Sequence, residues 1–288
     1  MEPIVDTALS LQHKRRALTQ RAATGVDFLM RLSADDLAER LATVERRFPD
    51  AATLFSMTSH AADALRASGK VDHVTRIEAL PEFLQDGEGQ LATADTVPLE
   101  PESMDLIVSL LALHEANDIP GTLIQIRRAL RPDGLFLAAF PGAGTLAELR
   151  DSLLQAEAEL SDGASPRVLP FADVRDGGGL LQRAGFALPV ADLETLTVRY
   201  DNLFALMKDL RAMGAANALV ARSRKPANLA LFMRASEIYA ERYSDPDGRI
   251  RATFSIVWLS GWAPHASQQK PAARGSATAS LAEALKPR

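Results

Sequence analysis

The sequence predicts an α/β fold with a mostly parallel β-sheet, and two observations lead to this prediction. The first is residues 104–140, where an apolar run, a helical pattern and the break Arg131-Pro132-Asp133-Gly134 precede a second apolar run. This order describes one strand, helix and strand unit. Strands this uniformly apolar are covered on both faces, as in a parallel sheet. Ligands of such sheets bind beyond the carboxyl ends of the strands, so residues 109–117 should border a pocket.

The second observation is that strand and helix patterns alternate through the rest of the chain. Residues 5–48 have apolar positions at helical spacing among many charges, and they predict two or three amphipathic helices. Seven strands are then expected at 52–55, 71–77, 91–94, 106–113, 135–140, 187–200 and 252–259. Helices are expected at 60–67, 120–130, 145–160, 171–184, 204–213 and 227–242, and Gly185 is a good C-terminal cap for the fourth of these.

Three parts follow from this order. Residues 1–48 should form N-terminal helices, and residues 49–262 should form the sheet domain. Residues 263–288 are rich in Pro, Ala, Ser, Gly, Lys and Gln, a composition that predicts a flexible tail.

Composition excludes several classes of function. A net charge of −5 and a pI near 5.6 give no overall attraction to nucleic acid. The absence of cysteine excludes disulfides, thiolate metal sites and a cysteine nucleophile, and five scattered histidines disfavour any metal site. The N-terminus does not resemble a secretion signal, and no apolar run approaches the roughly 20 residues that span a bilayer. A cytoplasmic location is therefore expected.

The wording of two segments resembles the class I S-adenosylmethionine (SAM) methyltransferases. Residues 104–109 read MDLIVS and residues 131–134 read RPDG, which match the fourth strand of that family and the turn before its fifth strand. The resemblance implies a Rossmann-like sheet of seven strands with an antiparallel last strand. It also implies a SAM site: Glu78 at the ribose, Ala94, Asp95 and Thr96 at the adenine, and Ser109, Leu110 and Leu111 beneath the methionine part.

The turn after the first strand departs from the family pattern. Residues 53–60 read TLFSMTSH and contain no glycine, although the family has a glycine-rich turn here. Glycine lets the backbone adopt positive φ and approach the ligand closely. Ser56 and Thr58 are the residues of this turn expected to face SAM. With His60, their side chains are expected to fill the glycine positions and to obstruct the usual mode of binding.

Other polar residues of the predicted pocket have two interpretations each. His114 is the weak catalytic candidate, since a histidine moves protons near neutral pH, but it is equally compatible with a packed residue of the pocket rim. Asn117 and Asp118 precede Pro120 and are expected to cap a helix. Glu148 and Arg150 either contact a substrate or form an ion pair.

The second half of the chain resembles a narrower subgroup. Its motifs lie in residues 145–150, 163–176, 206–217 and 258–277. The subgroup includes a mitochondrial assembly factor of respiratory complex I that hydroxylates an arginine of a complex I subunit, and its alphaproteobacterial relatives. The malonyl-carrier-protein methyltransferase of biotin synthesis lies near it.

This resemblance implies two classes of function. The first is a SAM-dependent methyltransferase-like enzyme that acts on a protein, such as a subunit of respiratory complex I, with arginine hydroxylation as a variant. The second is an assembly factor or chaperone that keeps the fold but binds SAM weakly or not at all. In both, the expected partner is a respiratory-chain subunit.

Overall fold

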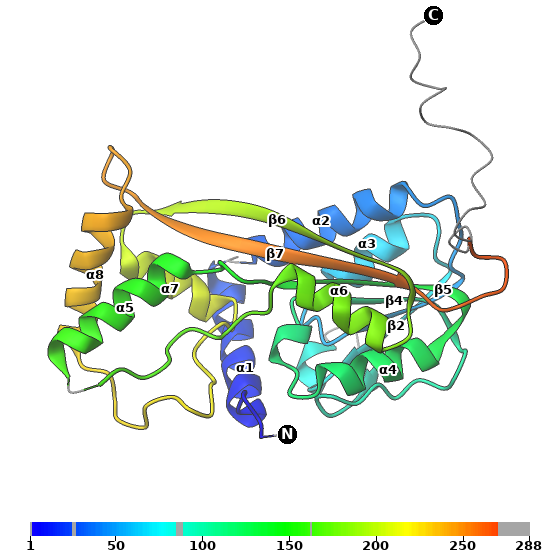
Figure 1. Ribbon diagram of the computed structural model, residues 1–288, viewed down its shortest axis with the longest axis horizontal. Helices are drawn as coiled ribbons and strands as arrows, with labels where there is room; N and C mark the ends of the chain where they lie inside the picture. The colour runs from blue at the N-terminus through cyan, green and yellow to red at the C-terminus, as the bar shows by residue number, and fades with distance from the viewer. Residues whose placement is uncertain (1, 25–26, 85–88, 162, 270–288) are drawn as a thin grey trace, which may run out of the picture.

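The computed structural model describes residues 2–24, 27–84, 89–161 and 163–269, and these form one α/β unit around a seven-stranded sheet (Figure 1). The strand order is β3-β2-β1-β4-β5-β7-β6. The strands from β1 to β5 pair in parallel, whereas β7 is antiparallel to both of its neighbours. The strands are β1 Asp50–Leu54, β2 His73–Glu78, β3 Gln90–Leu91, β4 Met104–Leu110, β5 Leu130–Pro141, β6 Ala187–Tyr200 and β7 Ile250–Trp262.

Eight α-helices and two short 3-10 helices, η1 and η2, surround the sheet within the described ranges. They are α1 Thr7–Thr24, α2 Phe28–Ala42, α3 His60–Ala67, η1 Pro81–Phe83, η2 Leu113–Glu115, α4 Ile119–Ala129, α5 Ala147–Leu160, α6 Val174–Arg183, α7 Leu203–Ala212 and α8 Leu229–Tyr243. The predicted architecture of seven strands with flanking and N-terminal helices is confirmed, and the N-terminal segment contains two helices.

The core has two layers, one on each face of the sheet. Along β4, Leu106, Val108 and Leu110 join the cluster that contains α2 and α3, whereas Ile107 joins the cluster that contains α4 and α6. This alternation follows from the two-residue period of a strand. Both faces of β4 are therefore buried, as its apolar sequence predicted.

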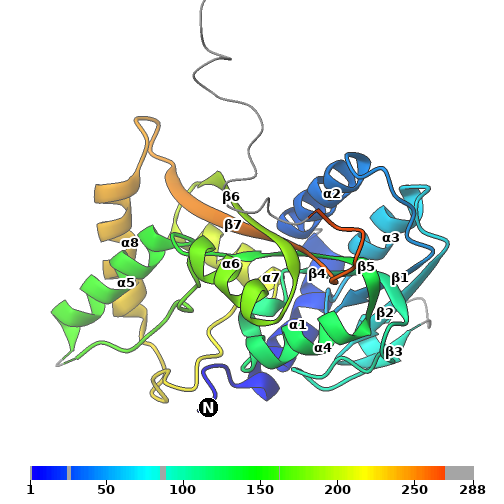
Figure 2. The ribbon, with the colours of Figure 1, turned by 45° about the vertical axis from the view of Figure 1, so that its right-hand side comes forward.

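Three helices form a helical cap at one end of the molecule: α5, α7 and α8. Figures 1 and 2 show the long strands β6 and β7 running from the α4 side toward this cap. α1 packs against α7 of the cap, and α2 packs against α3. The N-terminal helices therefore contact both the helical cap and a helix of the predicted sheet domain.

Some boundaries differ from the expectation. The strand expected at 91–94 is limited to Gln90–Leu91, because Thr93 and Thr96 form a turn joined by their hydroxyl groups. β5 begins at Leu130, before the predicted break, and its pairing with β4 shifts between Met104 and Leu106. Most of the predicted tail, 263–288, lies outside the described residues, which end at 269. No helix in the described ranges is long and apolar enough to cross a bilayer.

Candidate functional site

Two adjoining cavities lie at the carboxyl ends of β1, β2 and β4. The larger has a volume of about 330 Å³ and extends from the turn after β1 to the helical cap. The smaller has a volume of about 60 Å³ and lies beside the ends of β2 and β4. Four residues border both cavities: Val5, Lys14, Phe55 and Glu115. The site is therefore where a parallel sheet is expected to bind a ligand.

The turn after β1 adopts positive φ without glycine. Phe55 has a φ of 54° and Met57 a φ of 59°. Left-handed backbone costs a residue with a side chain about 1–2 kcal/mol. The turn is held by a hydrogen bond from the Phe55 N–H to the Ile77 carbonyl (2.8 Å) and one from the Met57 N–H to Glu78 Oε2 (3.1 Å).

This geometry corrects the sequence-based assignment of the turn. Ser56, Thr58 and His60 were expected in the glycine-like positions, but the residues with positive φ are Phe55 and Met57. The positions with positive φ therefore lie one residue before the expected Ser56 and Thr58, and no glycine in the sequence marks them. His60 points to Asp27, at the start of α2, with 2.7 Å between Nε2 and the Asp27 Oδ2.

Ser56 and Thr58 both border the larger cavity. They are 0% and 5% exposed, and their hydroxyl oxygens are buried with no hydrogen-bond partner in the described part of the chain. Buried polar atoms are nearly always paired. These two hydroxyls are thus available to a polar ligand.

Glu78 borders the smaller cavity at the end of β2 and is 1% exposed. Its Oε1 accepts a hydrogen bond from Arg76 Nη2 (3.2 Å). Burial raises the pKa of Glu78 to about 7, although Arg76 and the Met57 N–H favour the ionised form. A further hydrogen-bond donor in the cavity would therefore stabilise the carboxylate.

The expected adenine residues separate in the structure. Ala94 and Asp95 border the smaller cavity, and Asp95 Oδ1 accepts hydrogen bonds from the N–H groups of Asn117 (2.9 Å) and Asp118 (3.3 Å). Thr96 is exposed, borders neither cavity and bonds to Thr93. Asp95 thus holds the loop after β4 as well as lining the cavity.

The three residues expected beneath the methionine part also separate. Ser109 borders the smaller cavity, with its Oγ 3.5 Å from the Leu54 carbonyl oxygen, and Leu111 borders the larger one. Leu110 is fully buried in the core cluster and borders neither. Alternation along β4 turns Leu110 to the opposite face from Ser109, whereas Leu111 follows the end of the strand and has a φ of 54°.

His114 lies in the wall of the larger cavity beside Phe171. Burial lowers the pKa of His114 to about 4, and Glu115 offsets this only in part. Its Nδ1 is buried without a hydrogen-bond partner in the described ranges. At neutral pH the ring is therefore uncharged.

Residues from the N-terminal segment complete the site, and the sequence pattern did not identify them. Lys14 Nζ lies 2.8 Å from Glu115 Oε2. Asn117 was expected to cap a helix, but Asp118 alone does so, through the Gly121 N–H (2.9 Å). The Asn117 Oδ1 instead accepts hydrogen bonds from the N–H groups of Ile4 and Val5. The contacts of Lys14 and of Asn117 each join residues more than 100 positions apart, so local sequence patterns do not show them.

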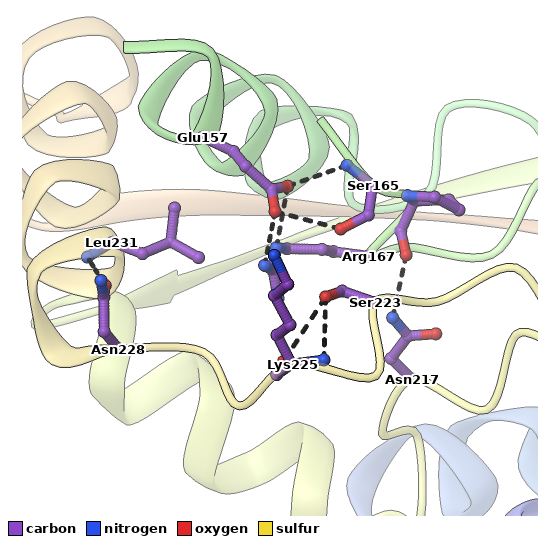
Figure 3. A network of polar contacts seen from close by, with 9 residues as sticks. Glu157, Ser165, Arg167, Asn217, Ser223, Lys225, Asn228 and Leu231 are labelled. Atoms are coloured by element: carbon purple, nitrogen blue, oxygen red, sulfur yellow. Dashed lines mark hydrogen bonds and ion pairs between the residues drawn. The ribbon is translucent and has the colours of Figure 1, made fainter. Parts of the chain in front are cut away.

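The cap side of the larger cavity is held by an ion pair (Figure 3). Arg167, which borders the cavity, donates to Glu157 through Nη2 (2.7 Å) and Nε (3.1 Å). Ser165 also donates to this carboxylate.

Glu148 and Arg150 border neither cavity. Glu148 accepts a hydrogen bond from the Thr253 hydroxyl group, and Arg150 lies 3.5 Å from the Thr145 carbonyl oxygen. Across the described ranges, no three His, Asp or Glu residues form a metal-binding group.

Comparisons with known proteins give the family. A family model described as "Methyltransferase domain" matches residues 56–138. The chain is 37% identical to the human "Arginine-hydroxylase NDUFAF5, mitochondrial" over 287 residues, which cover 97% of this chain and 83% of that protein. The chain belongs to the class I SAM methyltransferases. This confirms the prediction made from its sequence.

Two further relatives and one solved structure are similar to the chain. The Dictyostelium discoideum protein of the same name is 47% identical over 186 residues, which are 64% of this chain and 42% of that protein. "Malonyl-[acyl-carrier protein] O-methyltransferase" of Laribacter hongkongensis is 34% identical over 276 residues, covering 88% of this chain and 90% of that protein. The crystal structure of YcgJ from Bacillus subtilis shares the fold with a TM-score of 0.54 and 16% identity, covering 81% of this chain and 98% of that one.

The donor set of the two cavities fits SAM, the cofactor that the fold implies. Glu78 offers a buried carboxylate that accepts hydrogen bonds, and Ser56 and Thr58 offer buried hydroxyls without partners. The turn after β1 has positive φ at Phe55 and Met57, the conformation that glycine adopts most readily. The side chain of Phe55 borders both cavities, and that of Met57 borders the larger one.

Proposed function

We propose that this protein binds SAM across the ends of β1, β2 and β4 and acts on a group of a protein partner that enters the larger cavity. The proposed partner is a subunit of the respiratory chain. The main support is the pair of cavities that meet at a turn with glycine-like backbone geometry. Their arrangement offers one compartment to a nucleoside and another to a reacting group.

Each polar residue of the site has a proposed role. Glu78 would accept hydrogen bonds from the ribose hydroxyls, and Ala94 and Asp95 would lie beside the adenine. Ser56, Thr58, Ser109 and Leu111 would contact the methionine part. SAM, when bound, supplies a methyl group already activated by its sulfonium. The contribution of the chain is then to place the acceptor and exclude water.

The larger cavity suits this task because its wall is mostly apolar, with Phe171, Phe232 and Phe254 among its residues. His114 would position the acceptor there rather than remove its proton, because burial lowers its pKa to about 4 and makes the ring a weak base. Its uncharged imidazole has an Nδ1 without a partner in the described ranges, which would accept a hydrogen bond from an entering hydroxyl or guanidinium group.

The proposed substrate class rests on the relatives. One relative's name gives a malonyl group on a carrier protein as its substrate, and another's names arginine hydroxylation. A protein-borne acceptor is consistent with both. The cytoplasmic location expected from the sequence stays a prediction.

A second candidate function is an assembly factor without catalysis, and the turn is the observation that favours it. Phe55 and Met57 place side chains where glycine leaves open space, and Phe55 borders both cavities. Such a protein would use the same surface to hold a partner subunit.

Titration calorimetry of the purified protein with SAM and S-adenosylhomocysteine separates these candidates. The proposal expects heat of binding and a higher melting temperature with either ligand. Absence of both signals at millimolar ligand would exclude the SAM-binding enzyme and favour the assembly factor without catalysis. If SAM binds, mass spectrometry of the partner subunit after incubation distinguishes the addition of a methyl group from that of an oxygen atom.

A further inference from the structure

Lys14 lies in the wall that the two cavities share. It is on α1, one helical turn after Ser10, and both side chains contact Glu115. Lys14 Nζ lies 2.8 Å and Ser10 Oγ lies 2.5 Å from Glu115 Oε2. The Lys14 side chain is only 15% exposed. A cation from the N-terminal helix is thus nearly buried where the nucleoside and reaction compartments meet.

The electrostatic surroundings of Lys14 hold it in place and leave it able to bind an anion. Burial opposes ionisation of Glu115, but the nearby Lys14 lowers the pKa of Glu115 to about 2, so the Glu115 carboxyl group is ionised at neutral pH. Lys14 also favours ionisation of Glu78. Of the four residues that border both cavities, Lys14 is the only cation.

The ammonium group has hydrogen-bonding capacity left over. It has three N–H donors, and Glu115 is its one acceptor within the described residues. A buried donor without an acceptor is unfavourable unless a ligand supplies one. The other cations of the larger cavity are placed differently: Arg167 is paired with Glu157, and Arg211 is exposed. Lys14 is therefore the cation best placed for an anionic group at the junction.

We infer that Lys14 binds the carboxylate at the amino-acid end of SAM, and that Glu115 positions its ammonium group. This inference rests on the proposed function, in which the nucleoside lies in the smaller cavity beside Glu78. The amino-acid end then leaves that cavity past Phe55 and reaches the wall that contains Lys14. Glu115, being a carboxylate itself, is complementary to the ammonium group of the same amino-acid end.

Three ligands test this role, because they differ in the group that Lys14 would contact. SAM and S-adenosylhomocysteine both have the amino-acid carboxylate, whereas 5′-methylthioadenosine lacks the whole amino-acid end. Calorimetry of the Lys14→Met variant should show about ten- to hundredfold weaker binding of the first two, as expected for a lost charge-assisted hydrogen bond. Binding of 5′-methylthioadenosine should change by less than about threefold.

Two variants serve as controls. Arg15→Met removes the neighbouring positive charge of α1, which pairs with the exposed Glu82; neither residue borders a cavity, so all three affinities should stay unchanged. Lys14→Met with Glu115→Gln removes both charges of the pair, so no buried carboxylate loses its partner. It should show the same ligand pattern as Lys14→Met even if the single variant folds poorly.

The outcomes are distinct. Equal weakening of all three ligands would mean that Lys14 only supports the fold, and unchanged affinity for SAM would mean that it contacts no carboxylate; either result overturns the inference. Failure of the unchanged protein to bind any of the three would remove the proposed function, and this inference with it.

Discussion

The carboxylate of Glu78 accepts a hydrogen bond from the backbone N–H of Met57 at 3.1 Å, so the end of β2 holds the turn that follows β1. Met57 is one of the two residues in that turn with positive φ. The carboxylate that we propose for the ribose therefore also fixes the backbone of the turn that borders the larger cavity. In the proposed function, ligand binding and turn geometry are coupled through this one buried group.

Binding of SAM should weaken as the pH falls from about 8 to about 6. Burial raises the pKa of Glu78 to about 7, and protonation removes an acceptor of the ribose hydroxyls. Affinity should fall by up to about tenfold per pH unit below that pKa. His114, with its pKa lowered to about 4, does not titrate in this window.

Calorimetry across this pH range measures the effect. Glu78→Gln should bind SAM weakly and with little pH dependence, because its amide does not ionise. A flat profile for the unchanged protein would show that Glu78 does not contact the ligand.

Breaking the buried pair of Arg76 and Glu78 should destabilise the protein strongly. The two side chains are 2% and 1% exposed, and Arg76 Nη2 also donates to the Phe83 carbonyl at 2.7 Å. Arg76→Met leaves a buried carboxylate without its partner, which costs about 3–5 kcal/mol. Arg76→Met with Glu78→Gln should cost much less. Urea unfolding measures both.

The same experiment at two pH values tests the charge state of Glu78. Its folded pKa of about 7 lies above the ordinary value of 4.5, so the folded state holds an extra proton between these values. The contribution of Glu78 to stability should therefore fall as the pH rises through this window, and the double variant should lack that fall. Arg66→Met is the control, because its pair with Asp63 is exposed and contributes about 0–1 kcal/mol.

The turn after β1 should accept glycine, and the change should favour the ligand. Phe55→Gly and Met57→Gly remove the cost of positive φ and the side chains that narrow the site. Tighter binding of SAM by about fivefold or more is expected, which corresponds to about 1 kcal/mol. Leu188→Gly is the matched control, since Leu188 has a φ of 49° but is exposed on β6, away from both cavities. Equal affinities in all variants would show that these side chains do not restrict the ligand.

The sequence predicts the sheet well because its strands are marked by apolar runs with breaks between them. β4 and its buried residues follow directly from residues 104–110, and Asp118 is recognisable as a cap by its position before Pro120. Both features depend on residues close together in the sequence, so a local pattern is enough to predict them.

The site is harder to predict because it depends on distant contacts and on backbone geometry. Phe55 and Met57 adopt a conformation that their side chains disfavour, so no residue type indicated it. Lys14 appeared as one charge of an amphipathic helix, and its contact with Glu115 joins α1 to the loop after β4. Tertiary packing determines both.

The N-terminal segment should act as a cover over the site, and Asn117 is the residue that holds it. The Asn117 Oδ1 accepts hydrogen bonds from the Ile4 and Val5 N–H groups, both at 2.9 Å, and its Nδ2 donates to the Val5 carbonyl at 3.0 Å. Val5 borders both cavities and also pairs with Leu219 of the cap side. One side chain thus fixes the backbone that closes the junction of the cavities.

Asn117→Ala should open this cover. It removes four hydrogen bonds, the fourth being from Nδ2 to Thr7 Oγ1 (3.3 Å), and should cost about 1–3 kcal/mol, with faster amide exchange at Val5 and faster dissociation of SAM. Asn228→Ala is the control. It removes the N-terminal hydrogen bond of α8, which the Leu231 N–H donates to Asn228 Oδ1, and should lower stability without changing SAM dissociation. If both variants released the ligand at the same rate as the unchanged protein, the segment would be a structural strap and not a cover. Faster release in Asn117→Ala alone would show that the cover retains the ligand. Both variants lose side-chain hydrogen bonds to the backbone, but only Asn117 holds the segment at the junction of the two cavities.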